Sequence, residues 1–335
     1  MSTSSTSDLA RAVKRGFRSV IGGRELTLLA ACLGAAVIFT LLSRNFLTVA
    51  NLTVVARNCV ELLLVGLGMT LVITMGGIDI SLGMTVGIAA IAIGNLLTAG
   101  FDPLLAAIAG PLVGGALGLV TASVIVLGRI PAIVGTLGLL GVYRAAIYLM
   151  LGGQWISGLS PELGQLLNGR IAWIFPVNFA VIAGAYAAAF LMLRRMPFGL
   201  HLLAIGAAEE KARLSGVKVR RTRFLAYVMS GFLAGLAASF YVGTYRNVEM
   251  TIGGTLVLDA VAASVLGGTS ILGGRASLSG TILGVVLIRL LQNGFTLIGV
   301  PSLWQSVVTG ILLILVLSLE NVDLLRGSRT REIAV

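Results

Sequence analysis

Long apolar runs separated by short polar stretches make up almost all of the sequence from residue 26 to residue 319. A run of about 17–25 apolar residues is long enough to cross the hydrocarbon core of a bilayer as an α-helix. The runs fall at 26–42, 53–75, 82–99, 103–127, 131–151, 173–193, 224–245, 256–268, 277–298 and 302–319. They predict an all-α polytopic membrane protein with about ten transmembrane helices. The eighth run is short enough to be a broken or re-entrant piece, and eight or nine spans is the alternative if 82–99 or 256–268 does not cross.

Two glycine-punctuated turns occupy similar places in the two halves of the chain. The first runs from Met75 to Gly83 and the second from Gly267 to Arg275, and each lies between two apolar runs. A span that starts at a proline comes later in both halves, at Pro131 and Pro301. Paired glycine-interrupted segments are typical of transporters built from internal repeats. The similarity is weak, but it predicts two pseudo-repeated halves.

The composition agrees with a membrane protein. Only 11% of the residues are charged and 57% are hydrophobic, whereas a soluble domain has roughly 25% charged residues. The net charge of +11 does not indicate nucleic acid here, because cytoplasmic loops of membrane proteins collect Lys and Arg. With ten alternating spans, 18 of the 24 basic residues fall on the side of the two termini and three on the other side. This bias predicts that both termini are cytoplasmic.

The interior segment 194–223 is the exception to the apolar pattern, since it carries eight basic residues and the pair Glu209 and Glu210. Strong helix formers fill 207–214, and a glycine two residues beyond them can stop the helix with a left-handed cap. So short a helix must lie against something. Its basic residues could rest on anionic lipid, but its mixed charge suits a protein partner better. The predicted docking residues are Gly206, Ala208, Glu209, Glu210, Ala212, Arg213, Ser215 and Gly216.

Polar residues in or near the predicted spans are candidates for a pathway or a gate, because charges are costly in lipid. Asp79 and Ser81 can cap the third span, or they can belong to a gate that the neighbouring glycines allow to move. Arg144 could line a polar path or tie helices together through backbone carbonyls. The predicted pathway or gate residues are Asp79, Ser81, Arg144, Gly267, Gly268 and Ser270.

Two further charged pairs lie within the apolar runs. Glu61 follows Arg57 by four residues, which is the spacing of a same-face pair on a helix, so mutual neutralisation near the outer interface is expected. Asp259 is expected to pack within the second half, with Arg289 as its possible partner. A proton relay would require a chain of acidic residues through the membrane, and the sequence does not contain one.

The sequence excludes several kinds of chemistry. It has no G-x-x-x-x-G-K-[ST] motif, so any ATP and Mg²⁺ would be bound by another polypeptide and no cofactor is expected in this chain. His201 is the single histidine and is expected to be structural, so neither a catalytic triad nor a histidine metal site is expected. Cys32 and Cys59 both lie in apolar runs and imply no disulfide framework. A membrane-embedded enzyme is not expected either, because the sequence shows no cluster of catalytic side chains.

Four stretches in this order resemble the permease subunits of bacterial ABC importers for monosaccharides, the ribose, xylose, rhamnose and autoinducer-2 group. They are GMTLVITMGGIDISLG (68–83), RIPAIVGTLGLLGVYRA (129–145), the pattern FG…AIGAAEEKARLSGVKV (198–219) followed by YVMSGFLAGLAA (227–238), and LDAVAASVLGGTSILGGRASLSGTILG (258–284). The resemblance covers nearly the whole chain from about residue 50. The stretch GTLGLLGVYRA followed by LGGQWISGL looks most like the rhamnose and autoinducer-2 branch.

The resemblance implies a type II ABC importer-like fold and a membrane dimer with a second permease copy or a paralogue. It also implies an ABC ATPase subunit (often one tandem polypeptide) on the cytoplasmic face and a periplasmic sugar-binding protein outside. In such importers a short cytoplasmic helix couples ATP-driven closure to the pathway, and the matching positions here are Gly206 to Gly216. The Ser/Thr-rich and basic N-terminal arm is not explained by the family pattern.

The prediction is therefore a permease subunit of an ATP-driven importer of a sugar or sugar-like molecule in a bacterial inner membrane, in contact with lipid and without nucleic acid. An ion-coupled secondary transporter of a small polar solute is the alternative. The predicted organisation is a cytoplasmic arm (1–25), a transmembrane domain (26–320) that contains the coupling loop 194–223, and a cytoplasmic tail (321–335).

Overall fold

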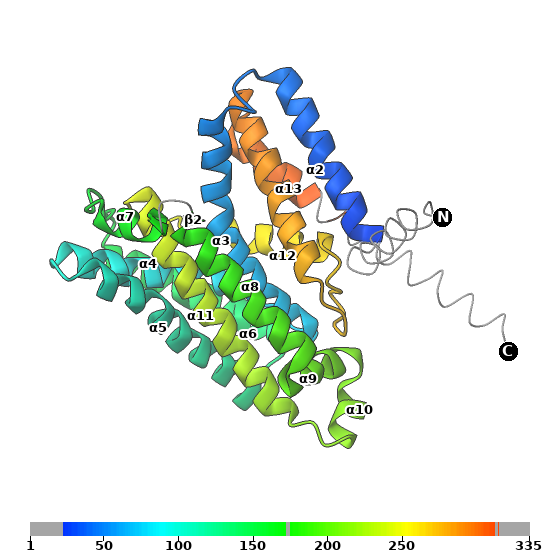
Figure 1. Cartoon of the computed structure of the whole chain (residues 1–335). Helices are drawn as coiled ribbons and strands as arrows, with labels where there is room; N and C mark the ends of the chain where they lie inside the picture. Colours follow the sequence, from blue (N-terminus) through cyan, green and yellow to red (C-terminus); the bar gives the residue numbers. More distant parts are fainter. Residues whose placement is uncertain (1–22, 172–174, 312–313, 315–335) are drawn as a thin grey trace, which may run out of the picture.

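The computed structural model describes residues 23–171, 175–311 and 314 of the chain. Helices account for nearly all of the regular structure in these residues, and the predicted all-α class is confirmed (Figure 1). The helices are α2 (Gly23–Leu42), α3 (Val49–Thr74), α4 (Leu82–Thr98), α5 (Pro103–Ala122) with its π-helical continuation η1 (Ser123–Leu127), α6 (Ala132–Leu151), α7 (Glu162–Asn168), α8 (Val177–Arg195), α9 (Pro197–Ala207), α10 (Glu209–Leu214), α11 (Val219–Tyr245), α12 (Leu256–Leu266) and α13 (Leu278–Leu297). Two antiparallel strands of two residues, β1 (Arg170–Ile171) and β2 (Phe175–Pro176), precede α8.

Among the described residues, seven helices are long and apolar enough to cross a membrane: α2, α3, α5 with η1, α6, α8, α11 and α13. They match seven of the ten predicted spans. The predicted spans 82–99 and 256–268 form the shorter helices α4 and α12, of 17 and 11 residues. The last predicted span is helical over 302–311, and its remainder lies almost entirely outside the described residues. The predicted N-terminal arm and C-terminal tail also lie outside them, except at the last residues of the arm.

Helix α12 is short because irregular chain, 246–255, takes up part of the length that a full span would use. The segment 246–255 runs alongside α4: a Cβ added at Gly94 would contact Val248, and one added at Gly87 would contact Ile252. At the start of α4, a Cβ at Gly83 would collide with the carbonyl oxygen of Gly253. The predicted broken eighth span is therefore a half-length helix that begins beside the first turn of α4.

Helix α3 lies at the centre of the bundle, since all of its residues from Cys59 to Thr74 are buried. Helices α5 and α11 pack closely because glycines face each other across their contact. A Cβ at Gly114 of α5 would collide with the carbonyl oxygen of Gly231 of α11, and one at Gly235 would collide with that of Gly110. Small residues allow such close approach of membrane helices, and this accounts for part of the high glycine content.

The two ends of the bundle differ in charge. Helices α9 and α10 lie at one end, called here the α10 end, and α7 lies toward the other (Figure 1). Arg129 shares a cavity with α10 residues, and Arg24 and Arg275 share another cavity with the last turn of α8. The basic residues that the sequence placed on one side of the membrane and that the structure describes thus gather at the α10 end.

Candidate coupling and gate site

The interior segment folds into two helices instead of the single predicted one. Helix α9, which is absent from the predicted elements, begins at Pro197, whose fixed φ suits the first helical position. Ala208 separates α9 from α10 with an extended backbone at φ −165° and ψ 94°. The predicted stop after α10 is confirmed: Ser215 caps the helix, and Gly216 has φ 85° in the left-handed region.

Helix α10 is attached to the bundle on one side and free on the other. Ala212 is 5% exposed and packs in a cluster with residues of α3, α8, α9 and α11. Glu209 accepts two hydrogen bonds from Arg223 of α11, at 2.7 and 3.0 Å. On the free side, Glu210 pairs with Arg213 at 2.7 Å, and the Leu214 side chain is 80% exposed. The free side of α10 therefore presents a mixed-charge surface with one exposed leucine.

Gly206 connects the docking segment to both glycine-punctuated turns. A Cβ at this position would collide with the carbonyl oxygen of Thr74, the last residue of α3, and with the backbone nitrogen of Gly274. That nitrogen donates a hydrogen bond to the Thr74 oxygen at 2.9 Å. A Cβ at Gly273 would lie 2.8 Å from both the Cα of Gly206 and the nitrogen of Gly76. We call the close approach of Thr74, Gly76, Gly206, Gly273 and Gly274 the glycine junction, and through it α9 touches both turns directly.

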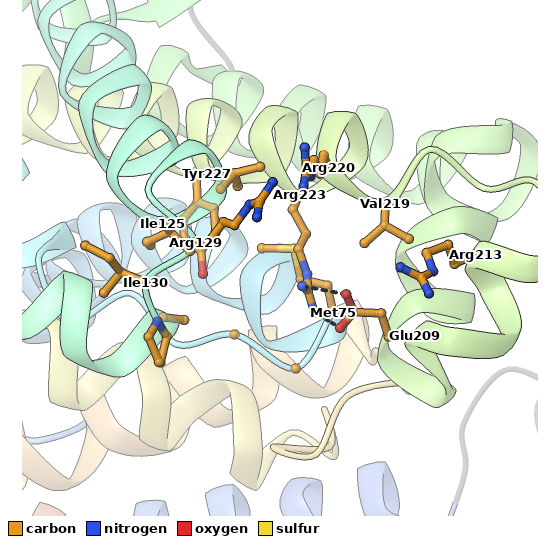
Figure 2. Close-up of a pocket in the computed structure, with 15 residues that line it drawn as sticks. Met75, Ile125, Arg129, Ile130, Glu209, Arg213, Val219, Arg220, Arg223 and Tyr227 are labelled. Carbon is orange, nitrogen blue, oxygen red and sulfur yellow. Dashed lines mark hydrogen bonds and ion pairs between the residues drawn. The ribbon is translucent and has the colours of Figure 1, made fainter.

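A cavity of about 500 Å³ lies beside the glycine junction, between α10, α11, the turn after α3 and the loop between η1 and α6 (Figure 2). We call it the arginine pocket, because it is lined by four arginines and one glutamate: Arg129, Arg213, Arg220, Arg223 and Glu209. Figure 2 shows the Glu209 carboxylate in contact with the Arg223 guanidinium at the wall that α10 forms. Arg129 has φ 55°, a conformation that is uncommon for a residue with a side chain. The pocket is strongly basic and contains two predicted docking residues, Glu209 and Arg213.

Asp79 and Ser81 lie in the first turn region, and both are buried. The Asp79 carboxylate accepts hydrogen bonds from the backbone nitrogen and the hydroxyl of Ser81, at 3.0 and 2.6 Å. The predicted capping of α4 is only partly right: Ser81 occupies the cap position, but its side chain makes no capping bond, and Asp79 orders the turn before the helix. The adjacent Ile78 accepts a hydrogen bond from Thr136 of α6 at 3.3 Å. The first turn therefore links α3, α4 and α6.

Gly267, Gly268 and Ser270 lie in the second turn, between α12 and α13. Gly267 packs against Gly280 of α13 so closely that a Cβ would collide with its backbone. The Gly268 carbonyl accepts a hydrogen bond from Arg275 Nε at 3.1 Å, and the Ser270 nitrogen donates one to the Arg275 carbonyl at 3.1 Å. Gly267 and Gly268 also line a cavity of about 610 Å³ with residues of α2, α8 and α9. The turn is thus an ordered loop that contacts α9, and a gating role for these residues stays a prediction.

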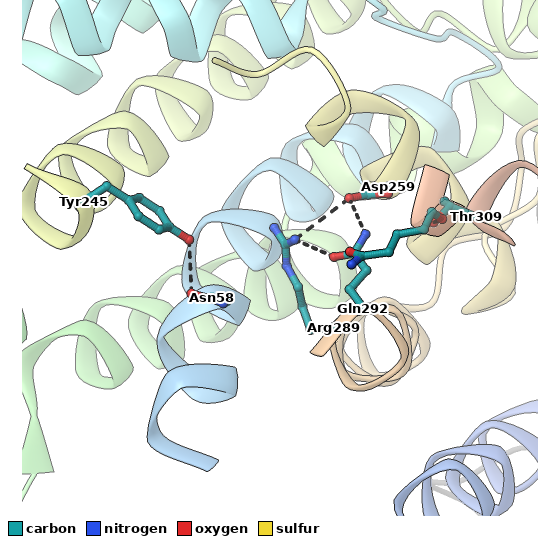
Figure 3. A network of polar contacts seen from close by, with 7 residues as sticks. Asn58, Tyr245, Asp259, Arg289, Gln292 and Thr309 are labelled. Atoms are coloured by element: carbon teal, nitrogen blue, oxygen red, sulfur yellow. Dashed lines mark hydrogen bonds and ion pairs between the residues drawn. The ribbon is translucent and has the colours of Figure 1, made fainter. Parts of the chain in front are cut away.

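Of the two charged pairs expected within the helices, the structure forms one among the described residues. Arg57 is exposed and Glu61 is buried, and the expected pair between them is not formed among the described residues. The expected pair of Asp259 with Arg289 is confirmed, with 3.9 Å between Oδ2 and Nη1. Gln292 bridges this pair, donating to Asp259 at 3.0 Å and accepting from Arg289 at 2.7 Å (Figure 3).

Arg144 lies apart from the other predicted gate residues. Its side chain is exposed on α6, on a face that also presents Leu137, seven residues earlier and 49% exposed, and Tyr148, four residues later and 44% exposed. The structure therefore brings together the docking segment and the two glycine turns but leaves Arg144 on an uncovered helix face.

Comparison with known proteins identifies the family. Residues 48–317 match the family described as branched-chain amino acid transport system / permease component. The ribose import permease protein RbsC of Bacillus subtilis (strain 168) is 34% identical over 286 residues, which is 85% of this chain and 89% of that protein. The autoinducer 2 import system permease proteins LsrC of Yersinia enterocolitica (serotype O:8 / biotype 1B) and Escherichia coli O157:H7 are 32% and 34% identical, over 90% and 88% of this chain and 84% and 86% of theirs.

A solved structure of a metal-chelate type ABC transporter in an inward-facing conformation aligns with 86% of this chain and 94% of its own, at 18% identity and a TM-score of 0.47. The predicted resemblance to sugar and autoinducer-2 import permeases is confirmed by the sequence relatives. Because the family model matches most of the chain, this chain belongs to the family of branched-chain amino acid transport system permease components.

Proposed function

We propose that this chain is the membrane-spanning subunit of an ATP-driven importer of a monosaccharide or a sugar-like small molecule such as ribose, rhamnose or autoinducer-2. The observation that carries the proposal is the arrangement of α10, which is exposed on one side and connected through α9 to the glycine junction. A protein that pushes on α10 would move α9 against the end of α3 and the second glycine turn. The permeases of ribose and autoinducer-2 import systems are among the relatives of the chain.

The motor in this proposal is a separate ABC ATPase, which binds ATP and Mg²⁺ and docks on Gly206 to Gly216. The sequence supports the assignment of ATP binding to a separate subunit, because it has no phosphate-binding P-loop of its own. The mixed-charge surface formed by Glu210, Lys211 and Arg213, with the exposed Leu214, would fit a groove on that ATPase.

The pathway in this proposal runs between two permease subunits, either two copies or a copy and a paralogue. The position of Arg144 supports this arrangement, because a guanidinium on an exposed face of a membrane helix is costly in lipid and requires a protein partner or a water-filled path. The apolar residues around it on α6 would pack against the second subunit. A secreted binding protein would supply the substrate at the end that carries α7.

The orientation and location belong to the same proposal: an inner bacterial membrane, with both termini in the cytoplasm. The gathering of basic residues at the α10 end supports it, because Lys and Arg accumulate on the cytoplasmic side of membrane proteins. The α10 end then faces the cytoplasm, where ATP is available.

Uptake by proteoliposomes tests the proposal against an ion-coupled transporter. Vesicles that contain the permease, its ATPase and the binding protein should take up labelled sugar or autoinducer-2 when ATP is supplied to the ATPase side, and a protonophore should not inhibit the uptake. Uptake by the permease alone that a protonophore abolishes would show that the ion-coupled mechanism is correct.

A further inference from the structure

An apolar groove of about 520 Å³ lies between α8 and α11, with α3 as its floor. Figure 1 shows α8 and α11 running along the same side of the bundle. Its walls are almost entirely nonpolar. Leu67 and Leu71 of α3 form the floor, and the walls are Val181, Gly184, Ala185, Ala188, Ala189 and Met192 of α8 with Val228, Met229, Phe232, Leu233 and Leu236 of α11. The groove lies within membrane-spanning helices, so its occupant must be apolar where it touches these walls.

Small side chains on α8 keep the groove open. A Cβ added at Gly184 would meet no atom within 4 Å, and Ala188 is exposed. A void in a protein interior would lose the contacts of its lining atoms, but in a bilayer a groove of this kind can be filled from outside. An acyl chain supplies the missing contacts without burying a polar group.

Beyond the apolar part of the groove, each of its two walls carries an arginine, Arg195 on α8 and Arg221 on α11. On α8 the lining positions recur every three or four residues and reach Met192, and Arg195 follows three residues later. On α11 the same spacing leads from Met229 through the exposed Leu225 to Arg221. Residues three and four apart share a helix face, so both arginines lie on the groove side at the α10 end.

Arg195 and Arg221 are exposed and, among the described residues, engage in no hydrogen bond or ion pair. Their neighbours are already engaged: the Arg194 guanidinium lies over the Phe190 ring at 4.9 Å, and Arg223 binds Glu209. Basic residues beside membrane helices attract anionic lipid headgroups. The groove therefore has apolar walls and, at one end, two guanidinium groups without a partner among the described residues. A molecule with a hydrocarbon chain and a phosphate is complementary to this arrangement.

We propose that this groove binds one anionic phospholipid, with an acyl chain between α8 and α11 and the headgroup phosphate between Arg195 and Arg221. The lipid touches α3 through Leu67 and Leu71, and α3 ends at Thr74 in the glycine junction. A bound lipid therefore stabilises the packing of α8 and α11 on the helix that the coupling segment contacts.

Native mass spectrometry of the purified permease with added phosphatidylglycerol or phosphatidylcholine tests the site. Phosphatidylglycerol should bind more tightly, and Arg195→Gln with Arg221→Gln should weaken it about fivefold each and about 25-fold together. The matched control is Arg220→Gln, which removes an exposed arginine from the arginine pocket instead of the groove. Equal affinity for the two lipids, or an equal loss with the control, would overturn the proposal.

A second pair of variants tests the groove itself. Ala188→Phe places an aromatic ring in the groove and should exclude the bound lipid. The matched change Ala183→Phe, at an exposed position on the opposite face of α8, should leave the lipid bound. Retention of phosphatidylglycerol by Ala188→Phe would overturn the acyl-chain assignment. Loss of a permease dimer with Ala188→Phe alone would also overturn it, because the groove would then hold a helix of a second subunit. Both variants are compared at equal monodispersity in size-exclusion chromatography, so that misfolded protein is not counted.

Discussion

Replacing Gly206 with alanine is the most direct perturbation of the glycine junction. The new methyl group would collide with the Thr74 oxygen and the Gly274 nitrogen, and its distance to the Gly273 carbonyl carbon would be 3.0 Å. These atoms belong to the backbone and cannot rotate away. Overpacking a tight site costs about 1–3 kcal/mol, and loss of the hydrogen bond between Gly274 and Thr74 adds about 1 kcal/mol. Alanine in a helix returns up to about 1 kcal/mol, so the net destabilisation should be about 1–3 kcal/mol.

Two measurements check this prediction. Thermal denaturation of the detergent-purified protein, followed by fluorescence-detected size exclusion, should show a lower midpoint for Gly206→Ala. ATP-driven uptake in proteoliposomes should fall more than the amount of folded protein does, because the displaced turns no longer follow α9. Gly34→Ala is the matched control, since a Cβ at Gly34 of α2 meets no atom within 4 Å. If Gly206→Ala equals this control in both assays, the glycine junction does not transmit movement of α10.

Three further predictions concern individual contacts. A double-mutant cycle of Glu209→Gln and Arg223→Gln, measured by thermal denaturation, should give a coupling of about 0.2–1 kcal/mol, because the pair is about half exposed; a coupling of zero would mean that the pair does not hold α10. Asp259→Ala should destabilise the protein by about 1–3 kcal/mol, because it removes the carboxylate that pairs with the partly buried Arg289 and accepts from Gln292, and an unchanged denaturation midpoint would contradict this. Gly114→Leu should abolish the folded, monodisperse protein, because no side chain fits between α5 and α11, and a normal elution profile would refute that packing.

The class of fold and most of the spans follow from the sequence because hydrophobic length is a local property. The half-length helix α12 was harder to predict, because the segment 246–255 before it packs beside α4 without regular structure. No periodic pattern marks such a segment. Helix α9 was missed for a related reason: its apolar residues pack against α8 and α11 at the end of the bundle and continue no span.

The segments that form the candidate site could be predicted from the sequence, but the contacts between them could not. The docking segment and both glycine turns stand out as breaks in the apolar pattern, yet nothing in the sequence shows that Gly206, Gly76 and Gly273 touch. The pair of Glu209 with Arg223 joins residues 14 positions apart across a turn, which helical spacing does not reveal. The spacing of Arg57 and Glu61 was misleading, because the buried environment of α3 placed only the glutamate inside.

The central claim is that an ATPase drives transport by docking on α10, and the variant that carries Glu209→Lys and Glu210→Lys tests it most directly. Glu210 lies on the free side of the docking helix, and Glu209 holds this helix to Arg223 of α11. Reversing both charges should therefore abolish co-purification of the ATPase and ATP-driven uptake in proteoliposomes, while the permease still reaches the membrane in normal amounts. Normal ATP-driven uptake by this variant would contradict the claim.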